Sequence, residues 1–288
     1  MSKTHRQETG VPTSAQEVVV DGVRLAIARE GAGPPVICLH ATGHGGRDFE
    51  AFAAGVRDRF EVIRIDWPGQ GRSGPDTAAA SAARYADLLR GAVAALGLDD
   101  PILVGCSIGG AAAVNYASRY GARALVLANP GGLVEVNAAT RKACRFLSRI
   151  FAAGARGAWW FGTLFAVYYR MVLPSAAAAG QRRRIVRAGY ETAPIMAQAW
   201  ASFAEDAADQ REIASRLPMP VLIAWAMQDK INNFAANAPA IAAMKTARLV
   251  KFEGGHAAFL EQPRQFIHEF LTFTAGLASP LRVARLSA

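Results

Sequence analysis

The segment Gly105-Cys106-Ser107-Ile108-Gly109 joins an apolar run to an alanine-rich run and could supply a nucleophile. The first run predicts a strand and the second a helix, so Ser107 would lie in a tight turn between them. Glycines two positions before and after the serine are needed because side chains there would collide. The N–H of Ile108, at the positive end of the helix, could hold an oxyanion. A structural glycine turn that happens to contain a serine explains the same residues, so the rest of the chain must decide.

A serine hydroxyl becomes a nucleophile when a base takes its proton and an acid orients that base. The chain contains five histidines. His5 lies in a polar stretch and His268 in a helical pattern, whereas His40 and His44 belong to a loop after an apolar run. His256 occupies a glycine-bounded loop between the last predicted strand and the last predicted helix, which makes it the base candidate.

The acid candidate is Asp229, which follows the buried-strand pattern "VLIAWA". Polar residues at the carboxyl ends of parallel strands gather at the ligand-binding edge of the sheet. The order Ser107, Asp229, His256 is the nucleophile, acid, base order of one known hydrolase scheme. Glu135 and Asp206 are the rival acids, and an ordinary turn aspartate is the structural alternative for Asp229.

The elements that must position these residues alternate regularly between strands and helices. Apolar runs predict strands, and the segments between most of them have helical spacing. This alternation predicts an α/β fold: a mostly parallel sheet of about eight strands with helices on both faces. The predicted strands cover residues 17–20, 24–28, 34–40, 61–66, 102–106, 124–130, 220–226 and 247–253.

Between residues 133 and 215 the alternation stops and only helical patterns follow. We therefore predict a core formed by residues 17–132 and 216–277, with an all-helical cap, 133–215, over the ligand-binding edge of the sheet. Residues 1–16 and 278–288 are predicted to be terminal tails.

Four motifs occur in one order along the chain. They are His40-Ala41-Thr42-Gly43, "DWPGQGRSG" at 66–74, the turn around Ser107, and Gly254-Gly255-His256. From about residue 17 to 277 the chain resembles the α/β-hydrolase fold superfamily with a helical cap. The resemblance implies that Ser107, Asp229 and His256 form a catalytic triad, without metal or organic cofactor.

The same resemblance assigns the loop after His40. It implies that the N–H of Thr42 is the second oxyanion donor, beside that of Ile108. Ala41 stands where the family usually has glycine, and a positive φ there would strain alanine. His40 is expected to anchor the loop, whereas Ala41 and His44 are expected to face the substrate.

The residues narrow the reaction class. Dehalogenases and epoxide hydrolases of this fold attack with a carboxylate, which Ser107 is not. C–C hydrolases of ring-cleavage products usually have tryptophan after the catalytic histidine, where this chain has Ala257. The segment "GHAAFLEQP" resembles the carboxylesterase and lactonase branch, which predicts cleavage of a small, largely apolar ester or lactone. A C–C hydrolase, a cofactor-free perhydrolase and a non-catalytic small-molecule receptor remain alternatives.

The net charge of +9 comes from one block of the chain. No Asp or Glu occurs between Val136 and Tyr190, whereas ten Lys and Arg residues do. A solvated basic face is the preferred interpretation, and attraction to anionic substrates or to a membrane is the alternative. No nucleic-acid motif accompanies the charge, so we expect no nucleic-acid partner. Because a solvated face is the preferred interpretation, we expect no membrane partner either.

The aromatic stretch "WWFGTLFAVYY" lies inside this block. Its rings could line an apolar substrate pocket, and Trp159, Trp160 and Tyr168 are the residues chosen for that role. Packing of the helix against the core is the alternative for at least half of them. An amphipathic surface lying on a membrane is a third interpretation.

Cellular location and assembly are weakly constrained. The polar N-terminus and the lack of an uninterrupted apolar run of about 18 residues predict a cytoplasmic protein. Three cysteines without CxxC spacing argue against a disulfide framework or a thiolate metal site. The sequence does not define the oligomeric state, and a homodimer is one of the alternatives.

Overall fold

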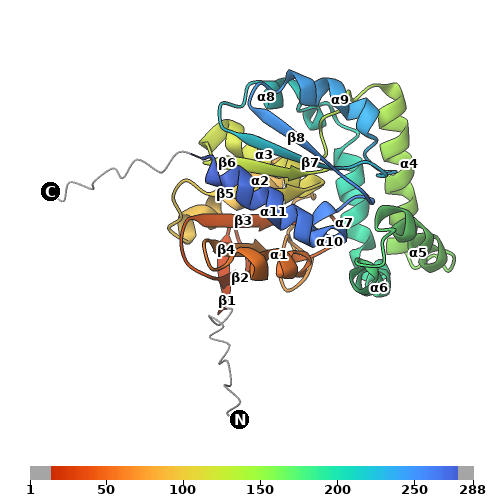
Figure 1. Ribbon diagram of the computed structural model, residues 1–288. Helices are drawn as coiled ribbons and strands as arrows, with labels where there is room; N and C mark the ends of the chain where they lie inside the picture. Colours follow the sequence, from red (N-terminus) through yellow and green to blue (C-terminus); the bar gives the residue numbers. More distant parts are fainter. Residues whose placement is uncertain (1–13, 278–288) are drawn as a thin grey trace, which may run out of the picture.

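The computed structural model describes residues 14–277, which form one eight-stranded sheet (Figure 1). The strand order is β1-β2-β4-β3-β5-β6-β7-β8. β2 pairs antiparallel with β1 and with β4, and all other pairs are parallel. The strands are β1 (Ser14–Val20), β2 (Val23–Glu30), β3 (Pro35–Leu39), β4 (Glu61–Ile65), β5 (Ile102–Cys106), β6 (Ala124–Ala128), β7 (Val221–Ala226) and β8 (Ala247–Phe252). This sheet confirms the predicted fold class.

The central strands are apolar on both faces because helices cover both sides of the sheet. Alternate residues of β3 belong to different cores: Ile37 and Leu39 to one, Val36 and Cys38 to the other. Helices α2 (Ala82–Ala95) and α3 (Ile108–Tyr120) pack together in the first core. Helices α1 (Glu50–Val56) and α11 (Pro263–Ala275) pack together in the second. Both cores hold β5 in place, and the serine turn follows that strand.

Every regular element between β6 and β7 is helical. These elements are α4 (Ala138–Ala155), α5 (Phe161–Val172), α6 (Ala179–Arg187), α7 (Gly189–Ser202), the 3-10 turn η2 (Asp206–Ala208) and α8 (Arg211–Ser215). Figure 1 shows α4, α5, α6 and α7 grouped beyond one end of the sheet. The division of the chain into core and cap stays a prediction.

Three short or late helical elements complete the core: the 3-10 turn η1 (Gly46–Phe49), α9 (Phe234–Ala243) and α10 (Ala258–Glu261). No helix within residues 14–277 combines the length and apolar character required to cross a bilayer.

The predicted N-terminal tail is too long, because β1 begins at Ser14 and not after residue 16. Ser14 to Gln16 pair with Arg29 to Ile27 of the long strand β2, which extends the hairpin beyond its apolar residues. Backbone pairing with β2 therefore determines the start of this edge strand. Residues 1–13 and the predicted tail at 278–288 lie outside the described residues.

Candidate active site

Ser107 lies at the turn between β5 and α3 with φ 53° and ψ −120°. A positive φ is rare for a residue other than glycine, and such strained backbone occurs at functional turns. A Cβ at Gly105 would lie 2.6 Å from the carbonyl oxygen of Gly109, and a Cβ at Gly109 would collide with the carbonyl oxygen of Leu39. Both glycines are therefore required sterically. The Ser107 carbonyl accepts the N–H of Gly131 at 3.0 Å, which links the turn to the loop after β6.

The N–H groups expected to hold an oxyanion lie on two segments. Ile108 is the first residue of α3, where N–H groups lack partners within the helix. In the loop after β3, the N–H of Gly43 donates to Gln70 Oε1 at 2.7 Å and that of His44 to the Ala41 carbonyl at 3.2 Å. Both of these donors are engaged within the protein, and the role of the Thr42 N–H as an oxyanion donor stays a prediction.

Ala41 does not have the strained backbone that alanine at a glycine position could bring. The positive φ of this loop, 78°, belongs to Gly43 instead. His40 fixes the start of the loop: its Nε2 accepts the N–H of Trp67 at 2.9 Å, and its Nδ1 lies 2.7 Å from the Ala41 carbonyl oxygen. The replacement of glycine by alanine therefore leaves this loop unstrained.

His256 and Asp229 form a buried pair in which Nδ1 of the histidine lies 2.7 Å from Oδ2 of the aspartate. Burial alone would lower the pKa of His256, but the charge and hydrogen bond of Asp229 outweigh it and raise that pKa. Burial would raise the pKa of Asp229, but the charge of His256 and nearby N–H groups outweigh it and lower that pKa. The pair thus favours an ionised aspartate and a histidine that readily accepts a proton.

The two rival acids lie elsewhere. Asp206 is ion-paired with Arg141, and its side chain is 90% exposed. Glu135 is also exposed, and its carboxylate lies 4.0 Å from Arg211. Asp229 is the one of the three candidates that contacts His256.

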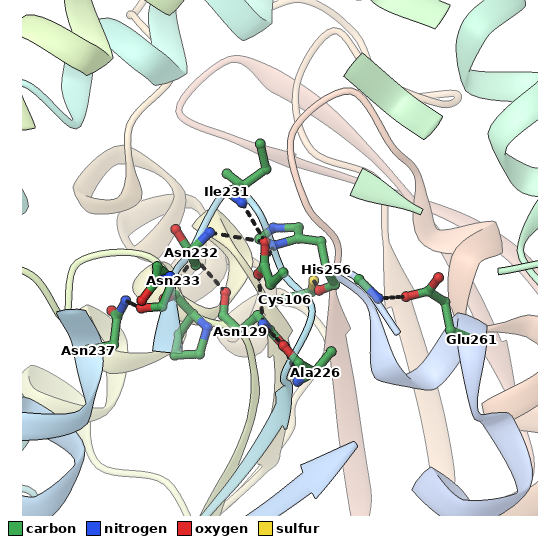
Figure 2. Close-up of polar contacts among 12 residues, drawn as sticks. Cys106, Asn129, Ala226, Ile231, Asn232, Asn233, Asn237, His256 and Glu261 are labelled. Atoms are coloured by element: carbon green, nitrogen blue, oxygen red, sulfur yellow. Dashed lines mark hydrogen bonds and ion pairs between the residues drawn. The ribbon is translucent and has the colours of Figure 1, made fainter. Parts of the chain in front are cut away.

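Asn129, which the sequence analysis did not single out, holds Asp229 in position. Its Nδ2 donates to Asp229 Oδ2 at 2.7 Å, and its Oδ1 accepts the N–H of Ala226 at 2.9 Å. The N–H groups of Ile231 and Asn232 donate to Asp229 Oδ1 at 2.7 and 3.0 Å (Figure 2). Asn129 has φ 42°, and its place directly after β6 was the available signal.

Glu261 is a second buried acid that the sequence analysis missed. Its carboxylate accepts the N–H of Gly255 and, at 2.9 Å, that of Ser175. Burial raises the pKa of Glu261, although these hydrogen bonds act against it. Figure 2 shows a hydrogen bond to the Glu261 carboxylate beside His256. Glu261 therefore ties the histidine loop to the segment that follows α5.

His44 forms a second buried pair, with Asp48 of η1. Its Nδ1 contacts Asp48 Oδ2, whereas its Nε2 is buried without a hydrogen-bond partner. Gln181 of α6 donates to the other oxygen of Asp48. The pair therefore links the loop of Thr42 to a helix of the segment between β6 and β7.

A cavity of about 410 Å³ brings most of the predicted site residues together. It is lined by Ala41, Thr42, His44, Ser107, Tyr168 and His256. Most of the remaining wall is apolar, with Val134, Leu147, Met196, Trp200 and Phe203 among its residues. The sequence analysis did not select these side chains because they come from separate elements of the chain.

Trp159 and Trp160 do not line this cavity, so their assignment to the pocket is wrong. Trp159 is 89% exposed and Trp160 is 37% exposed. Both lie in the turn directly before α5, and within the helix Phe161, Phe165 and Tyr169 are buried. The packing of α5 against its neighbours determines which of these aromatic residues reach the interior.

The geometry agrees with comparisons to known proteins. A family model described as alpha/beta hydrolase fold matches residues 34–263. The chain belongs to the α/β-hydrolase fold family. This match includes Ser107, Asp229 and His256.

Individual relatives share parts of the chain or its fold. A 2-hydroxy-6-oxononadienedioate/2-hydroxy-6-oxononatrienedioate hydrolase of Comamonas testosteroni is 32% identical over 142 residues, 46% of this chain and 49% of that protein. The chain spans between 37% and 57% of the length of the curated relatives that it matches.

Two solved structures show the same fold over most of the chain. A thermophilic esterase from Thermogutta terrifontis has a TM-score of 0.77 at 20% identity and covers 92% of this chain and 100% of its own. The enol-lactonase from Burkholderia xenovorans LB400 has a TM-score of 0.75 at 18% identity, with 90% and 100% covered.

Proposed function

We propose that the protein is a serine hydrolase that cleaves a carboxylic ester or lactone through an acyl-enzyme. The observation that carries the proposal is the shared cavity: the strained Ser107 and the His256–Asp229 pair line or adjoin the same space. The largely apolar wall favours a small apolar substrate, and no cofactor is part of the mechanism.

The first step forms the acyl-enzyme. His256 Nε2 takes the proton of Ser107 Oγ as the oxygen bonds to the carbonyl carbon, and the carbonyl electron pair moves to its oxygen. The N–H groups of Thr42 and Ile108 stabilise that oxyanion. Collapse breaks the bond to the leaving oxygen, which takes the proton from His256.

The second step reverses these roles with water. His256 takes a proton from water, the hydroxyl adds to the acyl carbon, and collapse breaks the bond to Ser107 Oγ, which takes the proton back from His256. Asp229 accepts the hydrogen bond from the Nδ1–H of His256 throughout and stabilises the cationic histidine. The products are a carboxylic acid and an alcohol, which are one molecule when the substrate is a lactone.

A p-nitrophenyl ester series with a lactone panel tests the proposal. We expect turnover of short or medium acyl chains that falls at least about 10³-fold in Ser107→Ala. Ser118→Ala is the matched control, because Ser118 lies on an exposed part of α3 and bonds only to the Asn115 carbonyl. Equal slow rates for the wild type and Ser107→Ala with every substrate would reject the serine hydrolase proposal and favour a non-catalytic small-molecule receptor.

C–C bond hydrolysis is the second candidate, because the relative from Comamonas testosteroni is named for a 2-hydroxy-6-oxo dienedioate substrate. Against it, Ala257 follows His256 where this chain would need tryptophan to match the usual C–C pattern. Turnover of a 2-hydroxy-6-oxo dienoate with a kcat/KM above that of every ester and lactone would favour this candidate.

A further inference from the structure

Helix α5 has an apolar side chain on nearly every side, although one of its faces contacts solvent. Phe161, Phe165, Tyr169 and Val172 are buried at the spacing of one helical face. Leu164, Val167 and Met171 follow another face of the helix with exposed fractions of 40%, 49% and 46%, and Trp160, which caps the helix, is 37% exposed. These four residues and Trp159, 89% exposed, are called the α5 surface.

The α5 surface begins in the turn before α5 and continues along that helix, at the rim of the molecule. Figure 1 shows α5 at the outer edge of the helical group, farther from the sheet than α7. Tyr190 of α7 extends the surface near its start: it is 43% exposed, and its ring lies 5.3 Å from that of Phe161. Large exposed apolar patches on soluble domains mark sites of interaction.

Exposed cations from a sequence segment without acidic residues lie before and along this surface. Arg156 precedes it and Arg170 lies on α5 itself, and both side chains are exposed. Within residues 136–190 there is no Asp or Glu to neutralise them. In the part of the chain that the structure describes, the one salt bridge from this basic block joins Arg141 to Asp206. Further exposed cations of α4 and α6 are Lys142, Arg145, Arg149, Arg183, Arg184 and Arg187.

We propose that the α5 surface docks onto phospholipid bilayers that carry anionic headgroups. Tryptophan at the start of the helix suits the boundary between headgroups and acyl chains, and the aliphatic residues that follow suit the apolar layer below. Arginine can keep its guanidinium among anionic headgroups while its stem lies along the apolar surface. This proposal replaces the expectation from the sequence that no membrane contact occurs.

Charge and apolar character distinguish an anionic bilayer from other partners of the α5 surface. A second copy of the chain would bring the same unneutralised arginines face to face, which opposes association. A nucleic acid would supply negative charge but no apolar layer for Leu164, Val167 and Met171. An anionic bilayer supplies both the charge and the apolar layer.

The buried face of α5 gives the docking surface a route to the site. Tyr168, Tyr169 and Val172 line the 410 Å³ cavity, and the Val172 carbonyl accepts the N–H of His256 at 2.7 Å. One helix therefore contacts the bilayer on one side and the cavity on the other. The docking itself does not rest on the proposed hydrolase function.

Vesicle co-sedimentation of the full chain tests the proposal. We expect binding to phosphatidylglycerol–phosphatidylcholine vesicles, at least roughly tenfold weaker binding to phosphatidylcholine alone, and release by high salt. The triple variant Leu164→Ser/Val167→Ser/Met171→Ser should weaken binding roughly tenfold or more. Val19→Ser, which changes an apolar residue 68% exposed on β1, is the matched control and should bind like the wild type.

A separate charge variant, Arg156→Glu/Arg170→Glu, should also lose binding, and far-ultraviolet circular dichroism with melting temperature checks that each variant is folded. Equal binding of the wild type and both variants, or no binding of the wild type to anionic vesicles, overturns the proposal. A dimer in sedimentation velocity that the triple variant abolishes, together with absent vesicle binding, would reassign the surface to self-association.

Discussion

Two buried histidine–aspartate pairs adjoin one cavity, and they differ in what holds the aspartate. Asp229 is fixed by Asn129 and by two backbone N–H groups of its own loop. Asp48 is held by Gln181 from α6, and it lies four residues after His44. The first pair joins two loops that follow different strands, whereas the second is a local contact that anchors a helix. Identical side chains thus serve different purposes according to the elements that bring them together.

The surroundings of the two histidines differ as well. The His256 side chain keeps 5% exposure, against 1% for His44. His256 lies after the last strand, where this fold carries its base, whereas His44 lies in the loop that offers Thr42. We therefore propose that His256 transfers the proton and that His44 has a positioning role.

Substituting glutamine for each histidine in turn gives the largest expected difference in kcat/KM. His256→Gln should lower kcat/KM at least about 10⁴-fold, because Ser107 loses its base. His44→Gln should lower it about tenfold or less, by loosening the loop that holds Thr42. Steady-state kinetics on the best ester measures both, and a larger loss in His44→Gln would exchange the two roles.

The aspartates should follow the same order with a smaller difference. Asp229→Asn removes the charge that stabilises cationic His256 and can turn an amide N–H toward Nδ1, which favours the wrong tautomer, so we expect a fall of about 10³- to 10⁴-fold in kcat. Asp48→Asn makes the same change beside a histidine to which we give no proton transfer, so it should cost about tenfold or less. Falls of equal size would mean that the cavity uses both pairs in the reaction.

The pH profile sharpens the assignment further. Activity requires neutral His256, so kcat/KM should fall as the pH drops below the pKa of His256, which Asp229 raises above its ordinary value. In Asp229→Asn, burial still lowers the pKa of His256, but the opposing charge of the aspartate is gone. The residual activity should therefore fall at a lower pH than the activity of the wild type does. If the acid limb of the profile stays unchanged in Asp229→Asn and shifts in Asp48→Asn, His256 is not the base of the reaction.

Asn129 should have a smaller effect than the aspartate that it holds. Asn129→Ala removes the Nδ2 donor to Asp229 and should lower kcat about 10- to 100-fold with little change in KM. Asn115→Ala on α3, where the side chain bonds only to the Ala111 carbonyl, is the control. A raised KM with unchanged kcat would give Asn129 a role in binding instead.

Local patterns predicted the strands and the serine turn because both depend on residues close in the chain. Gly105 and Gly109 are required by contacts within one turn, so the sequence exposes them. Asn129 and Asp229 meet across 100 residues, and no local signal distinguishes that asparagine from an ordinary turn residue. Glu261 was missed for the same reason, since its partners Gly255 and Ser175 lie on separate segments.

The aromatic stretch of α5 shows the opposite case, in which composition misled. Three of the six rings in this run were predicted to line the pocket, but Trp159 and Trp160 precede the helix, which itself turns only part of its surface inward. Tyr168 reaches the cavity, whereas Trp159 is almost fully exposed. The direction of each side chain depended on the packing of α5 against its neighbours, which periodicity in so apolar a segment does not define.

Labelling with a fluorophosphonate probe, followed by peptide mapping, tests the central claim most directly. The probe reports a serine activated by a base beside an oxyanion site. We predict a single adduct on Ser107 that persists in His44→Gln and is lost in His256→Gln. An adduct on another serine, or labelling that depends on His44 and not on His256, would contradict the account.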